Sequence, residues 1–358
     1  MIDHIYNFIT NINYYYFVLI TASFFIVSFN WPYIIKKTSI KKYEANQRIH
    51  ENEIPRLGGF IIFLFIFIYI FSNSIYTYSN SELSLFSFIC FCSLPIFLIG
   101  FCEDIFQNTS PYLRLFVMFL SVTVAIIFSG IQLPILSIPL IGNFISNSIL
   151  IYPFFIISIV IFMNGVNMID GSNGLMPMTV LGQLASLIFL SNAIGDYQLI
   201  NYFFLLALPL IIFTFFNYPF GKIFMGDLGA YVYGFFIAIM TIIFFGRNPV
   251  LPSWGAVLIL FYPLMEIFFS YYRKIFHDKI SPLYPDSYHI HLKMYYLLSN
   301  KIKKRRVANG LVMPTLSILW LSPCVLITWF YDSLLGILIS LVVLIVAYLG
   351  FYWSLPRK

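Results

Sequence analysis

The stretch LLGILISLVVLIVAYLGF, residues 334–351, contains no charged side chain. A helix crosses a bilayer with about 20 consecutive apolar residues, so a stretch of this length can span a membrane. Residues 58–71 form a second run of the same kind. A transmembrane barrel would instead show strands of about 10 residues in which apolar and polar side chains alternate. The sequence therefore predicts membrane-spanning helices.

The composition extends this prediction to the whole chain. Of its 358 residues, 60% are hydrophobic and 9% are charged, which leaves too few polar side chains to cover a water-soluble globule. Polar breaks between the apolar runs predict an all-α integral membrane protein, a polytopic bundle of about 10–11 transmembrane helices that forms one domain over residues 1–358. The expected spans lie near residues 14–35, 58–73, 84–101, 112–129, 147–163, 175–191, 200–216, 229–245, 251–272, 311–330 and 334–352.

One apolar segment is not expected to be a span. Residues 130–147 are interrupted by Pro134, Pro139 and Gly142, so we expect a non-spanning or β-like excursion on the outer side of the membrane.

Lysine and arginine decide the expected orientation, because short cytoplasmic loops of membrane proteins collect these residues. Every lysine and arginine except Arg247 falls on one side of the expected spans. That side, which also carries the unusual polar loops, is predicted to be cytoplasmic, with a periplasmic N-terminus and a cytoplasmic C-terminus. The same bias explains the net charge of +6, so no nucleic-acid partner is expected.

Carboxylates at a membrane boundary are costly to desolvate, so several of them in neighbouring loops indicate a function. Taken singly, each is more often a helix cap or a solvated loop end. The chain has 14 acidic residues, and five of them lie in the unusual polar loops of the predicted cytoplasmic side: Glu103, Asp104, Asp170, Asp227 and Asp286.

The segment NGVNMIDGSNG, residues 164–174, repeats a side-chain oxygen every three residues, at Asn164, Asn167, Asp170 and Asn173. This spacing brings the four side chains near one face of a helical turn or tight loop. Hard oxygen ligands suit Mg²⁺, which keeps several waters and takes further oxygens from a substrate phosphate. A capped loop between two spans is the rival interpretation.

Two further loops carry candidate phosphate ligands. In GKIFMGDLG, residues 221–229, Lys222 and Asp227 precede a helix whose N-terminus can present backbone N–H groups to phosphate. Asp227 could bind a metal, whereas Lys222 could equally be an orientation anchor. His289 and His291 lie in a basic loop without a nearby cysteine or third histidine, so phosphate contacts are favoured over zinc.

Carboxylates, metal ligands and cations at one membrane face are the groups that phosphoryl-type transfer requires, here between a water-soluble phosphate donor and a membrane-embedded acceptor. A transporter is the rival class. Its acidic residues should lie near the middle of the bilayer, where the expected spans place only Glu266.

Five motifs in a fixed order carry a resemblance to a known family. They are PRLGG at residues 55–59, GFCED at 100–104, NGVNMIDGSNGL at 164–175, GKIFMGDLGAY at 221–231 and PDSYHIHL at 285–292. Over about residues 55–296 the chain resembles the bacterial polyprenyl-phosphate N-acetylhexosamine-1-phosphate transferases, glycosyltransferase family 4.

The resemblance implies transfer of a sugar 1-phosphate from a UDP-N-acetylhexosamine to undecaprenyl phosphate, with release of UMP, in the bacterial inner membrane. It implies a need for Mg²⁺, with Mn²⁺ as an alternative, and it leaves a homodimer open. Asp227 and Asn167 are then the expected metal ligands. The expected catalytic residues are Glu103 and Asp104, which would position or deprotonate the attacking lipid phosphate, and Asp170, near the uridine diphosphate. The expected substrate-binding residues are Asn164, Asn173, Arg114, Lys222, His289 and His291.

The chain departs from the family pattern at two positions. Glu103 and Asn173 stand where many members have aspartate, and Asn173 cannot act as a base. These variants resemble the branch that starts surface polysaccharides of the O-antigen or capsule type. The muramoyl-pentapeptide branch, which usually carries a run of three histidines absent here, is an alternative. A non-catalytic binder of UDP-sugar or polyprenyl phosphate is another.

Overall fold

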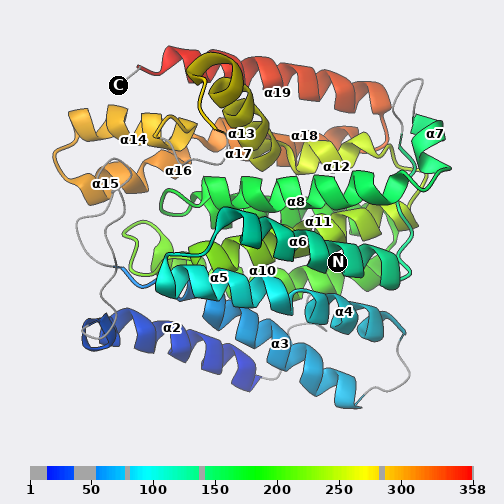
Figure 1. Ribbon diagram of the computed structural model, residues 1–358, viewed down its shortest axis with the longest axis horizontal. Coiled ribbons are helices and arrows are strands. Elements are labelled where there is room, and N and C mark those ends of the chain that lie inside the picture. Colours follow the sequence, from blue (N-terminus) through cyan, green and yellow to red (C-terminus); the bar gives the residue numbers. More distant parts are fainter. Residues whose placement is uncertain (1–13, 36–53, 77–80, 137–141, 282–286, 357–358) are drawn as a thin grey trace.

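The computed structural model of this protein describes residues 14–35, 54–76, 81–136, 142–281 and 287–356 (Figure 1). Within these ranges the regular elements are helices, and most of them run roughly parallel to one another. The basic segment that follows the first span, together with Asp286, Arg357 and Lys358, lies outside the described residues.

The longest helices coincide with the expected spans. In the described part of the chain, eight helical segments are long and apolar enough to cross a membrane, and residues 16–28 and 58–72 are shorter apolar segments. The prediction of an all-α, polytopic membrane protein is thereby confirmed. The continuous helices are α2 (Tyr14–Ile35), α3 (Gly58–Tyr76), α6 (Pro111–Phe128), α8 (Ile151–Ile169), α9 (Leu175–Ile194), α10 (Tyr197–Asn217), α11 (Gly226–Arg247) and α19 (Leu334–Ser354).

Three other segments are broken helices, and proline accounts for the breaks because it lacks an N–H group and its ring clashes with the preceding turn. Pro95 lies in the first turn of the second half of one segment, and Pro263, Pro314 and Pro323 occupy the other two. The pieces are α4 (Ser81–Cys92) and α5 (Leu94–Phe106), α12 (Trp254–Ile259) and α13 (Phe261–Tyr272), and α15 (Arg305–Gly310), α16 (Val312–Thr315), α17 (Ser317–Trp320) and α18 (Ser322–Phe330).

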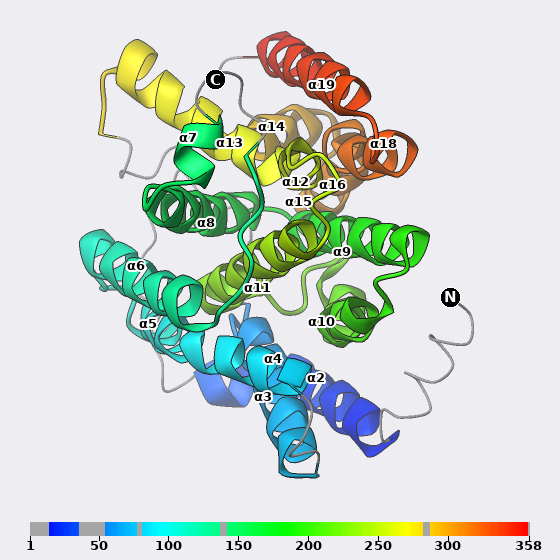
Figure 2. The same cartoon turned by 90° about the vertical axis from the view of Figure 1, so that its right-hand side faces the viewer.

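Helix α11 occupies the centre of the bundle, with α3, α5, α8 and α9 around it (Figure 2). The whole of its apolar span is buried by other helices, whereas only about a quarter of the α6 and α19 spans is buried (100% against 28% for each). A buried, apolar helix at the centre fixes the position of its own N-terminus. Residues at that N-terminus can therefore be held more firmly than residues on a surface loop.

The excursion expected between residues 130 and 147 is a short helix, α7 (Gly142–Ser146), preceded by extended chain. The Leu136 N–H donates to Ser146 Oγ at 2.9 Å, which closes the described part of this segment. The β-like alternative is not what the described residues adopt. Helix α7 lies at one end of the bundle, opposite α14 and α15 (Figure 1).

A helix that was not predicted from the sequence, α14 (Ile290–Lys301), begins within the histidine motif and includes His291. Before it, the π-helix η2 (Arg273–Asp278) extends α13 beyond its apolar part. Together η2 and α14 give regular structure to most of the described residues between α13 and α15.

Candidate active site

Asp104, at the end of α5, binds the N-terminus of α11. Its Oδ1 accepts a hydrogen bond from the Asp227 N–H at 2.9 Å, and its Oδ2 accepts one from the Leu228 N–H at 3.0 Å. The first N–H groups of a helix have no partner within the helix, and a carboxylate there also interacts favourably with the helix dipole. The sequence pattern allowed these N–H groups to meet phosphate, but in the structure Asp104 occupies two of them.

This contact depends on the residue that opens α11. Gly226 has a φ of +80°, a left-handed conformation that glycine adopts readily. A Cβ at this position would overlap the Asp104 carboxylate. The glycine that precedes Asp227 therefore allows α5 and α11 to meet through the carboxylate.

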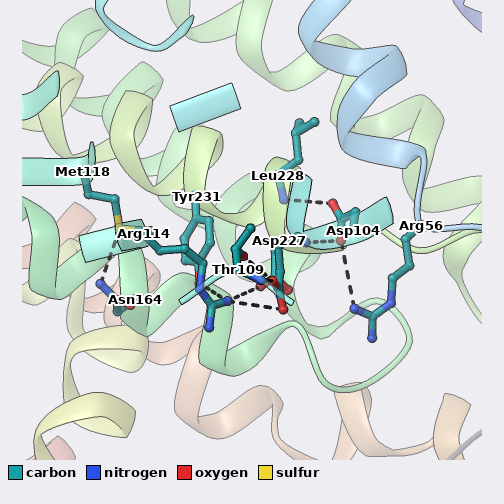
Figure 3. A network of polar contacts seen from close by, with 10 residues as sticks. Arg56, Asp104, Thr109, Arg114, Met118, Asn164, Asp227, Leu228 and Tyr231 are labelled. Carbon is teal, nitrogen blue, oxygen red and sulfur yellow. Dashed lines mark hydrogen bonds and ion pairs between the residues drawn. The ribbon is translucent and has the colours of Figure 1, made fainter. Parts of the chain in front are cut away.

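Arg114 on α6 links the acidic residues of this region (Figure 3). Its Nη1 lies 2.9 Å from Asp227 Oδ2, 3.8 Å from Glu103 Oε1 and 3.3 Å from the hydroxyl of Tyr231. Tyr231 stands one turn after Asp227 on α11, and its side chain is buried. The guanidinium group thus holds the catalytic candidates from α5 and α11 together.

Glu103 is also held from the other side. Its Oε2 accepts hydrogen bonds from both the N–H, at 3.0 Å, and the hydroxyl of Thr109, in the turn between α5 and α6. Glu103 is buried in this arrangement. A longer stem than aspartate lets the carboxylate reach both Thr109 and Arg114.

The PRLGG motif joins the α11 loop through the backbone. The Phe224 N–H donates to the Pro55 carbonyl at 2.8 Å, and the N–H groups of Gly58 and Gly59 donate to the carbonyls of Phe224 and Met225, both at 2.9 Å. These bonds place Arg56 beside the acidic residues, with its Nη1 4.0 Å from Asp104 Oδ1. A second guanidinium group therefore lies at the same end of α11.

Asp170 immediately follows α8, and it is only partly exposed. Burial raises the pKa of its carboxyl group to about 8; nearby Arg56 opposes the increase and Asp227 adds to it. The raised pKa favours the protonated form of this carboxyl group at neutral pH. A cation between Asp170 and Asp227 would stabilise the ionised form.

The three asparagines of the same motif have different surroundings: Asn164 and Asn167 lie in the last turns of α8, and Asn173 lies in the loop after it. Asn164 Nδ2 donates to the Val160 carbonyl at 2.8 Å and lies 3.7 Å from Met118 Sδ (Figure 3). Asn167 is partly exposed, and its carbonyl accepts a hydrogen bond from the Asp170 N–H. Asn167 thus lies one helical turn before Asp170, at the same end of α8.

Asn173 is buried, with 1% of its surface exposed. Its N–H donates to Asn309 Oδ1 at 2.9 Å, and its Nδ2 donates to the Pro219 carbonyl at 2.8 Å. These bonds tie the loop to α15 and to the segment after α10. These bonds give Asn173 a structural role in this position, and the substrate contact expected from the sequence stays a prediction.

The histidine motif lies against the Asp170 loop. A Cβ on Gly171 would overlap the His291 ring, so the absence of a side chain at Gly171 lets the ring approach the backbone. The rings of His289 and His291 are nearly parallel, with centroids 5.7 Å apart. His289 Nδ1 lies 3.0 Å from Oε1 of Glu266, a residue of α13. Lys222, in contrast, is exposed.

Within the described ranges, no group of three or more His, Cys, Asp or Glu side chains is gathered as a metal site. The donor set still fits a divalent cation that takes further oxygens from a substrate. Four carboxyl groups, of Glu103, Asp104, Asp170 and Asp227, face the two guanidinium groups of Arg56 and Arg114. The carboxyl groups outnumber the guanidinium groups, and Asp227 disfavours the ionised form of Asp170. Both features favour the binding of an additional cation.

Sequence reasoning missed several residues that the structure adds to this region. Arg56 and Tyr231 lie inside two of the motifs, and the four-residue spacing from Asp227 to Tyr231 on one helix was a usable signal. Thr109 and Glu266 belong to none of the five motifs, so no sequence pattern placed them in this site. Glu266, expected mid-span, lies within α13 and contacts the histidine motif.

Fold and site together define a polytopic membrane protein whose carboxyl and guanidinium groups converge at one end of a central helix. The profile of glycosyl transferase family 4 matches residues 85–245. A probable undecaprenyl-phosphate N-acetylglucosaminyl 1-phosphate transferase of Bacillus subtilis (strain 168) is 25% identical over 73% of this chain and 72% of its own length. The undecaprenyl-phosphate alpha-N-acetylglucosaminyl 1-phosphate transferase of Thermotoga maritima is 29% identical over 79% of this chain and 80% of its own length.

A phospho-N-acetylmuramoyl-pentapeptide-transferase of Streptococcus pyogenes serotype M6 is 27% identical over 62% of this chain and 70% of its own length. The profile match and the named relatives support the polyprenyl-phosphate N-acetylhexosamine-1-phosphate transferase family for this chain, and with it the class of phosphoglycosyltransferases. The family resemblance drawn from the five motifs is thereby confirmed.

Proposed function

We propose that the protein transfers an N-acetylhexosamine 1-phosphate from its UDP-linked form to undecaprenyl phosphate, with release of UMP. This reaction would be the first membrane step of a surface polysaccharide of the O-antigen or capsule type. The activities for which the Bacillus and Thermotoga relatives are named support the acceptor and the class of sugar. The observation that carries the proposal is the convergence of Asp104, Asp227 and Arg114 at the N-terminus of α11.

In the proposed reaction a phosphate oxygen of the lipid attacks the β-phosphorus of the UDP-sugar. A new P–O bond joins the two phosphates, and the bond between the β-phosphorus and the bridging oxygen breaks, so that UMP leaves. Charge accumulates on the phosphate oxygens, and fixed cations stabilise this charge where water is excluded. Arg114 and Arg56 are the guanidinium groups that could do so, since both already lie beside carboxylates that a phosphate could replace.

The two acidic residues at the end of α5 would act differently. Both oxygens of Asp104 accept backbone hydrogen bonds from α11, so Asp104 positions Asp227. Glu103 accepts from Thr109 and faces Arg114 at 3.8 Å, so it orients the guanidinium group toward the lipid phosphate. This division of roles favours positioning over deprotonation as the contribution of the Glu103–Asp104 pair.

Asp227, Asp170 and Asn167 would hold Mg²⁺ or Mn²⁺, the cation supplying charge stabilisation to the diphosphate when bound. Asp170, whose pKa is about 8 without a cation, would lose its proton as the cation binds. His289, His291 and Lys222 remain the proposed contacts to the donor phosphates.

The proposed place of reaction is the cytoplasmic face of the bacterial inner membrane. The distribution of lysine and arginine supports this orientation, because the exposed cations of residues 301–306 lie at the end of the bundle that holds α14 and α15 (Figure 1).

The pentapeptide branch is a second candidate for the donor, because relatives named for that activity match a large part of the chain. The two candidates differ in the donor alone. A donor screen that includes UDP-N-acetylmuramoyl-pentapeptide separates them.

The test is release of labelled UMP from UDP-N-acetylhexosamines by purified protein with undecaprenyl phosphate and Mg²⁺. We expect lipid-dependent turnover that Asp227→Asn lowers by at least about 100-fold, because the substitution removes a charge at the reacting phosphates. The matched control is Asp196→Asn. Asp196 lies at the opposite end of α11 from the candidate site, where its Oδ1 is 3.2 Å from Arg247 Nη2. Binding of the nucleotide sugar without turnover, for every donor tried, would favour the non-catalytic alternative.

A further inference from the structure

Glu266 is a buried carboxylate that the proposed reaction does not use. It lies on α13 with 1% of its surface exposed, and three groups approach it. Oε1 lies 3.0 Å from His289 Nδ1 and accepts a hydrogen bond from the Ile290 N–H at 3.2 Å, while Oε2 accepts one from the Tyr348 hydroxyl at 2.7 Å. A charge buried this deeply is retained where it is paired and fully hydrogen-bonded.

These contacts determine which nitrogen of His289 carries the proton. An ionised carboxylate has no proton to donate, so Oε1 accepts from both the Ile290 N–H and Nδ1, and Nδ1 of His289 is the donor. The Nδ1–H tautomer then leaves Nε2 as the nitrogen through which the ring can meet a ligand. A carboxylate that fixes both the orientation and the tautomer of an imidazole is a recurrent device for making that imidazole effective.

Helix α19 supports the same segment at further points. Tyr352 donates its hydroxyl proton to the Tyr288 carbonyl at 3.0 Å, and its own carbonyl accepts from Lys293 Nζ at 2.9 Å. Phe269 of α13 packs edge-on against Tyr348 and Tyr352. Helices α13, α14 and α19 accordingly lie together on one side of the bundle (Figure 2).

The histidine motif is therefore held at both ends. His289 is fixed by Glu266, and His291 rests against Gly171, the residue that follows Asp170. The planes of the His289 and His291 rings are 8° apart, so the contacts with Glu266 and Gly171 hold the two rings in nearly the same orientation. The motif faces the Asp170 loop because α13 and α19 hold it there.

The geometry points to Glu266 as a positioning residue for the proposed reaction. With Tyr348 hydrogen-bonded to it, Glu266 orients His289 so that Nε2 meets the diphosphate of the nucleotide sugar. This inference rests on the proposed function. It also gives α19, which lies outside the matched residues 85–245, a part in substrate binding.

The test is a double-mutant cycle on the affinity for UDP, the part common to all candidate donors, in the presence of Mg²⁺. The variants of the full-length protein are Glu266→Gln, His289→Ala and their combination. We expect each single change to weaken UDP about 10-fold, since a charge-assisted hydrogen bond contributes about 1.5 kcal/mol or more. In the His289→Ala background, Glu266→Gln should have no further effect, because Glu266 acts through the imidazole.

Tyr348→Phe keeps the ring and removes one hydroxyl, so it provides a milder variant that should fold if Glu266→Gln does not. We expect it to weaken UDP by about 3-fold in the wild-type background and not at all with His289→Ala. Asp196→Asn is the control for loss of a buried carboxylate elsewhere, and thermal unfolding of each variant in detergent monitors folding.

The inference is overturned if Glu266→Gln and Tyr348→Phe bind UDP as the wild type does, or if their losses persist undiminished with His289→Ala. In either case the wild type still binds UDP and turns over, so the proposed function survives. A wild type that neither binds UDP nor turns over any donor would instead overturn the proposed function, and this inference with it.

Discussion

At the scale of single residues, Asp104 shows how one carboxylate can connect two helices of a candidate site. The acidic pair at residues 103 and 104 was expected to act on the lipid phosphate. The structure gives Asp104 two backbone partners on α11 and leaves Glu103 with Thr109 and Arg114. Adjacent residues on a helix point about 100° apart, so these two carboxylates reach different partners.

Gly226→Ala tests this arrangement at its tightest point. Alanine is strained at a φ of +80°, and its Cβ would overlap the Asp104 carboxylate. We expect a loss of about 2 kcal/mol or more in the free energy of unfolding, seen as a lower midpoint of thermal unfolding in detergent, together with a fall in turnover.

The matched control is Gly350→Ala on α19, where a Cβ would meet no atom within 4 Å. This variant should unfold at or above the wild-type temperature, because alanine favours a helix by about 1 kcal/mol over glycine. Equal unfolding temperatures for the two variants would show that Asp104 and Gly226 are not tightly coupled.

At the scale of elements, α14 illustrates a helix that apolar length could not reveal. Its 12 residues, IHLKMYYLLSNK, interleave apolar side chains with polar and charged ones and are too few to cross a bilayer. Its first turns are nevertheless buried by contacts with other elements. Lys293 is an example: its Nζ lies 4.0 Å from the centre of the Tyr352 ring and donates to the Tyr352 carbonyl. A buried lysine of this kind looks like any other loop cation in the sequence.

Lys293→Met should detach α14 from α19. Methionine retains most of the volume but loses the hydrogen bond and the cation–π contact, so we expect a loss of about 2 kcal/mol in stability. Limited proteolysis of the segment between α13 and α15 should become faster. Lys301→Met, at an exposed position of the same helix, is the control and should leave both the unfolding temperature and the cleavage rate unchanged.

At the scale of the whole molecule, the motifs from five separate segments meet at one end of the bundle. The contacts of Arg56 with Asp104, of Gly171 with His291 and of Asn173 with Asn309 connect residues far apart in the chain. At the other end, Arg247 pairs with Asp196, and Gly246 lies against the extended segment before α7. The two ends are thus chemically distinct.

Orientation can be tested by thiol labelling in intact cells. Single cysteines at Lys303 and Val250, both exposed and at opposite ends, would be introduced with Cys102→Ser, since the other three cysteines are buried. A membrane-impermeant maleimide should label Val250→Cys from outside, and Lys303→Cys only after the membrane is opened. The reverse pattern would place the candidate site on the periplasmic face.

The sequence alone determined the class of structure and the approximate positions of most spans, and it pointed to the family; the expected span at 251–272 instead folds as the two short helices α12 and α13. These properties depend on local apolar length, on polar breaks and on ordered motifs, all of which are written along the chain. The single-domain extent and the possibility of a homodimer remain predictions from the sequence.

Only the tertiary structure decided which side chains meet. Asn173 became a buried link to α15, Asp104 a cap of α11, and Glu266 a partner of the histidine motif. The spacing of residues along the chain cannot state such pairs, because they join helices that are distant in sequence and come together only when α11 is buried at the centre. The sequence states which residues carry a carboxylate, but the packing of the helices determines the hydrogen-bond partners of each carboxylate.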